Sequence, residues 1–437
     1  MRHGAHGRDR SSCAARAEEL KKVREWGAVA AFVGRPAEEL AGPIPGVRRS
    51  TDPGCAGRVA HGFHEAAWGV GVAAKERFLF IDQFRGLVGI MMALGHSSGY
   101  FNSVWKTLDM FDPLFSSFGQ FALRYMGYLC APGFLMMNGA VSWLTYQKRV
   151  AHGATPWQAK WHLIQRGLFL IVVQVLIVNT AWKAFRYLDL LHIGIISTIG
   201  ITMCLLALFI NLRWQFRLAI ALVTFIVHPL LLRIPYNPDN FWSMVVMQTW
   251  VDAGDWNKYP VLPWFGLGVM GSVMASGWMS AWKTPRSRIA WSWGIGLGAI
   301  ALAGIIRITG GFGNTFGYDF VGSYSFFLDQ KYPPNVFHNL WFFGAVTFMV
   351  GTIHFIGQFA MPAVKWLGIV GRVPLFFYVM HITILSLVAD RFGVFYRQGA
   401  VAASLIGWVA LLAVMLPLAW WFGKVKAKTN NPILKLV

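Results

Sequence analysis

Long apolar runs separated by short polar breaks dominate the chain from residue 80 onward. Each run is long enough to cross a hydrocarbon layer of about 30 Å as a helix. The pattern predicts ten membrane-spanning helices, at 80–100, 122–146, 162–182, 189–210, 216–233, 261–281, 289–308, 338–358, 367–389 and 401–422. Membrane helices tolerate internal proline and glycine, so Pro132, Pro374 and Pro417 do not argue against this assignment. We therefore expect an all-α integral membrane protein.

The first 76 residues differ from the rest of the chain. They are rich in Gly, Ala and Arg and contain no continuous apolar run. Such a segment cannot bury a core, and we expect it to be disordered or weakly helical. It does not match the pattern of a secretory signal peptide. The chain is therefore divided into a basic segment at 1–76 and a membrane domain at 77–437. An alternative is that the start codon has been assigned too far upstream.

Composition supports the membrane assignment. Hydrophobic residues make up 56% of the 437 residues and charged residues only 13%, which is typical of a membrane protein. The net charge of +20 is compatible with nucleic-acid binding, but the basic residues lie in short loops between apolar runs. Orientation in a bilayer explains them better, so we expect no nucleic-acid partner. No histidine, carboxylate or cysteine spacing resembles a zinc site, so we expect no metal.

The loops alternate in charge. One set is basic and contains no Asp or Glu, whereas the other set holds every acidic residue beyond the first run, from Asp109 to Asp390. Lys and Arg mark cytoplasmic loops, so both termini are predicted to be cytoplasmic. In this orientation the Asp82 and Arg85 end of the first helix faces the cytoplasm, and His96 lies toward the opposite side.

The first predicted helix carries the candidate chemistry. Arg85 and His96 are 11 residues apart, about three helical turns or roughly 16 Å, and they share one face. Polar groups inside a membrane are costly unless they are paired or line a cavity. Asp82 and Arg85 are suited to a simple ion pair. The functional alternative is that Arg85, together with Arg372 from a distant helix, binds a phosphate-bearing ligand, while His96 acts as general base.

Several motifs resemble the heparan-alpha-glucosaminide N-acetyltransferase family, and bacterial members look closest. The first helix contributes Asp82, Arg85-Gly86 and Met91-Met92-Ala93-Leu94 followed by His96. Further along the chain the matching motifs are Arg124 with Cys130-Ala131-Pro132-Gly133-Phe134, Arg166-Gly167, Ile196-Ser197-Thr198-Ile199-Gly200, Tyr259-Pro260 with Pro263-Trp264, Lys331-Tyr332-Pro333-Pro334, and Gly371-Arg372-Val373-Pro374 ending in His381. The resemblance covers about 77–437. Relatives carry Asp before the first-helix His and a His after the second-helix Arg, where this chain has Gly95 and Gly127.

The resemblance implies a transmembrane acyltransferase with acetyl-CoA as cytoplasmic donor and a carbohydrate or small-molecule acceptor on the far side. The expected membrane is the bacterial inner membrane. We expect His96, His381 and Asp82 to serve catalysis and Arg85 and Arg372 to bind the donor. The acceptor would be held by residues from three further motifs, Arg124, Trp264 and Lys331.

Two other functions stay open at this stage. Intramembrane charges also suit a proton-coupled transporter, although 77–233 and 261–422 show no internal similarity that would indicate inverted repeats. Gly95 and Gly127 leave room for an inactive relative that serves as a membrane partner. The identity of the acceptor, the acyl group and a possible homo-oligomer are not determined by the sequence.

Overall fold

The computed structural model describes residues 78–108, 117–190, 192–429 and 431, which all belong to one unit of the chain, Val70–Val437. Within these ranges the protein is helical and has no β-strand. The expected all-α class is therefore confirmed for the described residues. The predicted basic segment 1–76 lies outside them.

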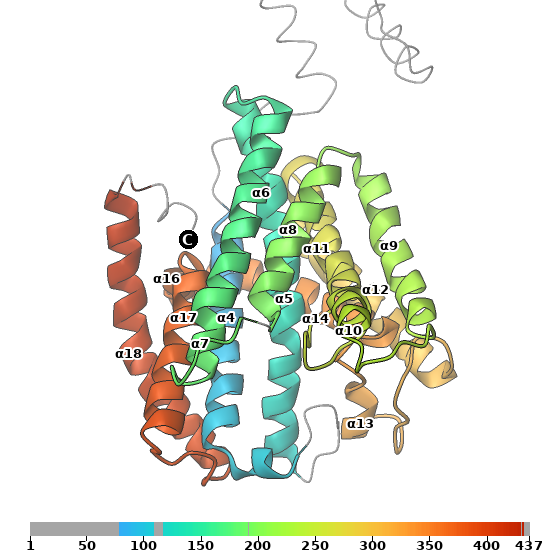
Figure 1. The fold of residues 1–437 in the computed structure, drawn as a ribbon. Helices are drawn as coiled ribbons and strands as arrows, with labels where there is room; N and C mark the ends of the chain where they lie inside the picture. The colour runs from blue at the N-terminus through green and yellow to red at the C-terminus, as the bar shows by residue number, and fades with distance from the viewer. Residues whose placement is uncertain (1–77, 109–116, 191, 430, 432–437) are drawn as a thin grey trace, which may run out of the picture. The chain divides into compact units, whose positions relative to one another are not determined.

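The membrane domain is built from long helices joined by shorter ones (Figure 1). The first half contains α4 (Leu79–Phe101), α5 (Phe118–Ala151), α6 (Pro156–Val173), α7 (Asn179–Trp182), α8 (Ile195–Phe209), α9 (Trp214–Leu231) and α10 (Phe241–Trp250). The second half contains α11 (Val261–Ser276), α12 (Pro285–Thr309), α13 (Tyr324–Phe327), α14 (Val336–Phe359), α15 (Met361–Lys365), α16 (Leu367–Gly371), α17 (Pro374–Leu385) and α18 (Val401–Lys428). Single π-helical turns, η3 (Gln174–Val178), η4 (Gly277–Ala281) and η5 (Ser386–Arg391), continue α6, α11 and α17.

Seven helical stretches in the described part of the chain are long and apolar enough to cross a membrane. They are Pro156–Trp182, Trp214–Leu231, Val261–Ala281, Pro285–Thr309, Val336–Phe359, Pro374–Arg391 and Val401–Lys428, and they coincide with seven of the ten predicted runs. The other three runs form α4, α5 and α8, of which α8 has only 15 residues. The number of ten spans therefore stays a prediction.

Two helices begin where local chemistry, rather than hydropathy, sets the start. Helix α6 begins at Pro156, six residues before the predicted run, because Thr155 and Gln158 form a capping box and Pro156 suits the first turn. The predicted run 367–389 is divided at Pro374. Proline lacks an N–H and disfavours the helical conformation of the residue before it, so α16 and α17 are separate helices.

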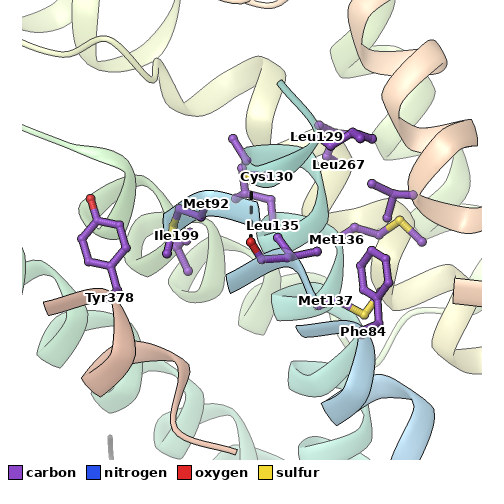
Figure 2. Close-up of a cluster of buried hydrophobic side chains, with 14 of the residues drawn as sticks. Phe84, Met92, Leu129, Cys130, Leu135, Met136, Met137, Ile199, Leu267 and Tyr378 are labelled. Atoms are coloured by element: carbon purple, nitrogen blue, oxygen red, sulfur yellow. Dashed lines mark hydrogen bonds between the residues drawn. The ribbon is translucent and has the colours of Figure 1, made fainter. Parts of the chain in front are cut away.

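Helix α4 lies beside α5 and contacts α16, α17 and α18, so residues far apart in sequence surround it (Figure 1). Glycine makes the closest approach possible. A Cβ on Gly86 would overlap the Leu367 carbonyl of α16, and one on Gly371 would overlap the Asp82 carbonyl of α4. The core between α4, α5, α8, α11 and α17 is filled by Met, Leu and Phe side chains, drawn in Figure 2.

The α5–α11 contact gives a direct test of this packing. A Cβ on Gly139 of α5 would overlap the Gly268 carbonyl of α11, so Gly139→Ala should destabilise the protein by roughly 1–3 kcal/mol through overpacking. Thermal unfolding of the purified protein measures this loss. A Cβ on Gly298 meets no atom within 4 Å, so Gly298→Ala is the matched control. Equal melting temperatures for both variants would contradict the packing described here.

Candidate functional site

A cavity of about 1000 Å³ runs along α4. Arg85 lines one end, His96 lies three turns further on, and Trp105, which follows the helix, lines the cavity near the opposite end of α4. The rise of an α-helix places Arg85 and His96 roughly 16 Å apart along the axis. The cavity thus follows α4 through most of its length and connects the Arg85 end of the bundle with the loops at the opposite end.

His96 is joined to a second histidine. Its Nδ1 lies 2.8 Å from Nε2 of His381 on α17, and Nδ1 of His381 lies 2.7 Å from the Phe377 carbonyl oxygen one turn earlier. The carbonyl can only accept, so His381 Nδ1 carries a proton. In a neutral ring His381 Nε2 then accepts, and His96 Nδ1 donates to it. This order leaves the lone pair of His96 on Nε2.

Aromatic rings surround His96 on the cavity side. The Trp182 ring meets the His96 ring edge-on at 5.2 Å between centroids, and Tyr378 does so at 6.1 Å. Trp182 also stacks on Tyr100 at 6.0 Å. All four of these residues line the cavity. The site is therefore a histidine bordered by flat, amphipathic rings that leave few alternative positions for its imidazole.

The Arg85 end of the cavity holds hydrogen-bond donors without partners. Arg166 Nε of α6, Asn138 Nδ2 and Ser142 Oγ of α5 are buried and make no hydrogen bond within the described residues. All three residues line the cavity together with Arg85. Buried polar groups are normally satisfied. A set of unsatisfied donors beside two guanidinium groups suits a ligand that brings anionic or carbonyl oxygens.

The cavity wall near His96 carries Lys331. Its Nζ donates to the Gly127 carbonyl of α5 at 3.0 Å and lies 5.0 Å from the centre of the Tyr128 ring. A Cβ on Gly95 would lie 3.8 Å from the Gly127 Cα, so Lys331 reaches α5 opposite the turn of α4 that holds His96. Gly95 and Gly127 therefore face each other.

An ion pair orders the loop that carries Lys331. Arg307 of α12 donates to Asp329 at 2.8 Å, and the two side chains are 1% and 0% exposed. Asp329 also accepts hydrogen bonds from the backbone N–H groups of Thr315, Phe316 and Gln330. Because Asp329 is two residues before Lys331, this network limits where Lys331 can lie.

A second network shapes the loop end of the cavity. Gln174 Nε2 donates to Asn179 at 2.7 Å, and Gln174 Oε1 accepts from the Ile196 N–H at 3.0 Å. Asn179 in turn donates to the carbonyls of Asp189 and His192. These bonds join η3, α7 and the start of α8. They hold the backbone at Asp189 and His192 in place, and Lys183, Asp189 and His192 line the cavity.

The structure brings some of the predicted site residues together and leaves others apart. Residues that line the cavity are Arg85, His96, Arg124 and Lys331. His381 is fully buried behind His96. Asp82 is not among the lining residues and lies 3.8 Å from Arg85. Neither exposed Arg372 nor fully buried Trp264 lines the cavity, and Trp264 packs behind Tyr259. From the sequence, Asp109 and Asp112 in the adjacent loop are candidate partners of Arg124, and both lie outside the described residues.

Sequence reasoning did not select Arg166, Asn138 or Ser142 as site residues. Arg166 lies close to the start of the predicted run at 162, whereas the early start of α6 places it ten residues into the helix. Asn138 and Ser142 are four residues apart on an otherwise apolar stretch of α5, so they share a face. That spacing was the available signal, since both point to the same cavity.

The apolar helices and the histidine-centred cavity define an integral membrane protein with a buried polar site. A family model for the catalytic part of heparan-alpha-glucosaminide N-acetyltransferase matches residues 77–304, more than half of the chain. The chain belongs to this family, and the expected family is confirmed. No curated protein matches the chain. The family implies a transferase, and the matched region includes Arg85, His96, Arg124 and Arg166.

The buried ion pair gives a second prediction. Asp329→Asn leaves the buried Arg307 without a carboxylate, which should cost roughly 3–5 kcal/mol in unfolding free energy. Thermal unfolding in detergent measures the effect. Asp390→Asn is the matched control, because its partner Arg186 is exposed and an exposed pair contributes little. A smaller loss for Asp329→Asn than for Asp390→Asn would contradict this interpretation.

Proposed function

We propose that this protein transfers an acyl group, most simply acetyl, from cytoplasmic acyl-CoA to a hydroxyl or amine of a carbohydrate acceptor on the opposite side of the membrane. One observation carries the proposal. A single cavity connects the donor-rich Arg85 end, the His96 imidazole and the outer loops. Two substrates entering from opposite ends would meet at His96. Membership of the acetyltransferase family supports the reaction class.

His96 acts as the general base in this proposal. The hydrogen bond to His381 places the lone pair of His96 on Nε2, and no described residue donates a hydrogen bond to that nitrogen. Nε2 accepts the proton of the acceptor hydroxyl or amine as its oxygen or nitrogen attacks the thioester carbonyl carbon. The same proton then passes to the departing thiolate of CoA. His381 holds the His96 ring in the productive tautomer and stabilises its charged form.

The donor would enter at the Arg85 end. Guanidinium groups recognise phosphate through two parallel hydrogen bonds, and Arg85 and Arg166 lie at this end of the cavity. The rise of about 16 Å between Arg85 and His96 gives room for an extended pantetheine arm between the phosphates and the thioester. Asn138 and Ser142 then supply hydrogen bonds to the amide groups of that arm. Arg372, in contrast, is left at the protein surface.

The acceptor would bind between His96 and the outer loops. Trp182, Tyr100 and Tyr378 offer ring faces there, and Asp189, Asp255 and Asp390 line the outer part of the cavity. Flat rings combined with polar groups are well suited to a sugar. Arg124 and Lys331 add positive charge on the α5 side of the same region. Trp264 supports this wall indirectly, since it packs against Tyr259.

The orientation follows from the loop charges, and we place both termini in the cytoplasm, with the Arg85 end facing the CoA pool of a bacterial inner membrane. Lys424, Lys426 and Lys428 at the end of α18 agree with this orientation. The cavity alone would also suit a transporter. Release of thiol from acetyl-CoA by the purified protein, compared with solute uptake in vesicles, separates the two functions.

His96→Ala should abolish transfer, because His96 supplies the base. The fold should stay intact, because the His96 side chain is only half-buried. The measurement is thiol release from acetyl-CoA with glucosamine as the acceptor probe, and the expected loss is about 10²–10⁴-fold. His152→Ala, at the exposed end of α5, is the control. Full activity in His96→Ala would refute the assignment of the base.

Arg166→Met should weaken donor binding without changing the chemical step. Loss of a hydrogen bond to a charged group costs about 1.5–3 kcal/mol, so the KM for acetyl-CoA should rise roughly tenfold or more while kcat changes little. The exposed Arg213, replaced in the same way, serves as the control. An unchanged KM in Arg166→Met would show that the donor does not reach this end of the cavity.

A further inference from the structure

Two tyrosines, Tyr259 and Tyr332, lie beside Lys331 on the cavity wall. Tyr259 precedes α11, and Tyr332 follows Lys331 in the loop before α14. Their hydroxyl oxygens are 3.2 Å apart, and both residues line the cavity. Two loops that are 73 residues apart in sequence thus bring two phenols and an ammonium group to one place on the cavity wall.

The position of this group relative to His96 follows from backbone contacts. Lys331 Nζ is bonded to the Gly127 carbonyl, and Gly127 faces Gly95, the residue before His96. Tyr332 is adjacent to Lys331 in sequence, and the Lys331 Nζ lies 5.1 Å from the centre of the Tyr332 ring. The tyrosine pair, which lies in two loops, and His96 of α4 therefore border the same part of the cavity.

Tyr259 is held firmly by its surroundings. Its carbonyl accepts from Thr198 Oγ1 at 2.6 Å and from Asn257 Nδ2 at 2.9 Å, while its N–H donates to Asn257 Oδ1 at 2.9 Å. The fully buried Trp264 packs on its ring. Gln330 Nε2 likewise donates to the Tyr332 carbonyl at 3.0 Å. Both tyrosines are thus fixed by hydrogen bonds that do not use their hydroxyl groups.

The Lys331 ammonium makes the two hydroxyls differ in acidity. Burial favours the neutral form of Tyr332, but the neighbouring Lys331 ammonium and the bond to Tyr259 outweigh it, so the pKa of Tyr332 lies below its ordinary value. Burial raises the pKa of Tyr259. Either hydroxyl can be the donor in this pair. When Tyr259 donates, the Tyr332 oxygen accepts, and the more acidic Tyr332 O–H is left to donate to a ligand in the cavity. A more acidic O–H is a stronger hydrogen-bond donor.

We propose that Tyr332 is a catalytic residue that donates its O–H to the carbonyl oxygen of the acyl group, opposite His96. Lys331 and Tyr259 are positioning residues that polarise this hydroxyl. The proposal rests on the acyltransferase function proposed above. It adds the group that stabilises the negative charge formed during transfer, which is commonly the largest single contribution to acyl transfer.

The electron and proton movements balance without a further reactant. As the acceptor oxygen or nitrogen bonds to the carbonyl carbon, His96 Nε2 takes the acceptor proton and the C=O electron pair moves onto oxygen. The resulting oxyanion accepts a hydrogen bond from Tyr332, which keeps its proton throughout. The C=O bond then re-forms, the C–S bond breaks, and the CoA thiolate takes the proton from His96.

Tyr332→Phe tests the proposal, because it removes one oxygen and keeps the ring that Lys331 contacts. Full-length protein would be assayed for thiol release from acetyl-CoA, with and without glucosamine. We expect kcat to fall on the order of 100-fold or more, with the KM for acetyl-CoA within a few-fold of the parent. Tyr259→Phe should lower kcat less, because the Tyr332 hydroxyl is retained.

Tyr125→Phe is the matched control. Tyr125 is half-buried, as Tyr332 is, but its hydroxyl accepts from Trp341 and it does not line the cavity. Unchanged kcat in Tyr332→Phe, or an equal loss in Tyr125→Phe, would overturn the role of Tyr332. A parallel fall in melting temperature with unchanged specific activity of the folded fraction would also overturn it. If the parent protein itself releases no thiol, the proposed function fails instead.

Discussion

The hydrogen bond from His381 to the Phe377 carbonyl is the interaction on which the site depends. A helix carbonyl cannot donate, so this bond fixes the proton of His381 on Nδ1 and, through it, the proton of His96 on Nδ1. A backbone acceptor one turn earlier does this without a buried carboxylate. The chain of hydrogen bonds therefore orients the His96 imidazole while both rings stay neutral, and it adds no further charge to the membrane domain.

The cavity explains how the remaining polar groups tolerate their position. Arg85, Arg124, Arg166 and Lys331 line it along its length, whereas its acidic lining residues among those described are Asp189, Asp255 and Asp390 near the outer loops. Ionisable groups within a membrane protein face a cavity or one another. At the loop end Lys183, Lys258 and Arg397 offset these aspartates, whereas Arg85 and Arg166 have no carboxylate among the lining residues described. The Arg85 end therefore favours an anionic ligand, and the loop end a neutral one.

Sequence patterns predicted the helical class and the residues of α4 because both depend on local periodicity. Arg85 and His96 share a face at any helix geometry, so their alignment along one cavity was foreseeable. The contact between His96 and His381 was not, because it depends on how α17 packs after the break at Pro374. For the same reason the sequence predicted that Arg372 joins Arg85. The arginine that lines the cavity together with Arg85 is instead Arg166, whose position depends on where α6 begins.

The loops at the end of the cavity opposite Arg85 contribute lining residues together with the helices. The family match ends at residue 304, yet His381, Lys331 and Tyr332 come after it in sequence. Lys331 reaches α5 only because Arg307 of α12 holds Asp329, and three backbone N–H groups hold the same carboxylate. A loop ordered by a buried ion pair can present Lys331 and Tyr332 with little conformational freedom. Helices α4 to α6 thus carry Arg85, His96 and Arg166, while the second half of the chain orients His96 and closes the cavity wall near it.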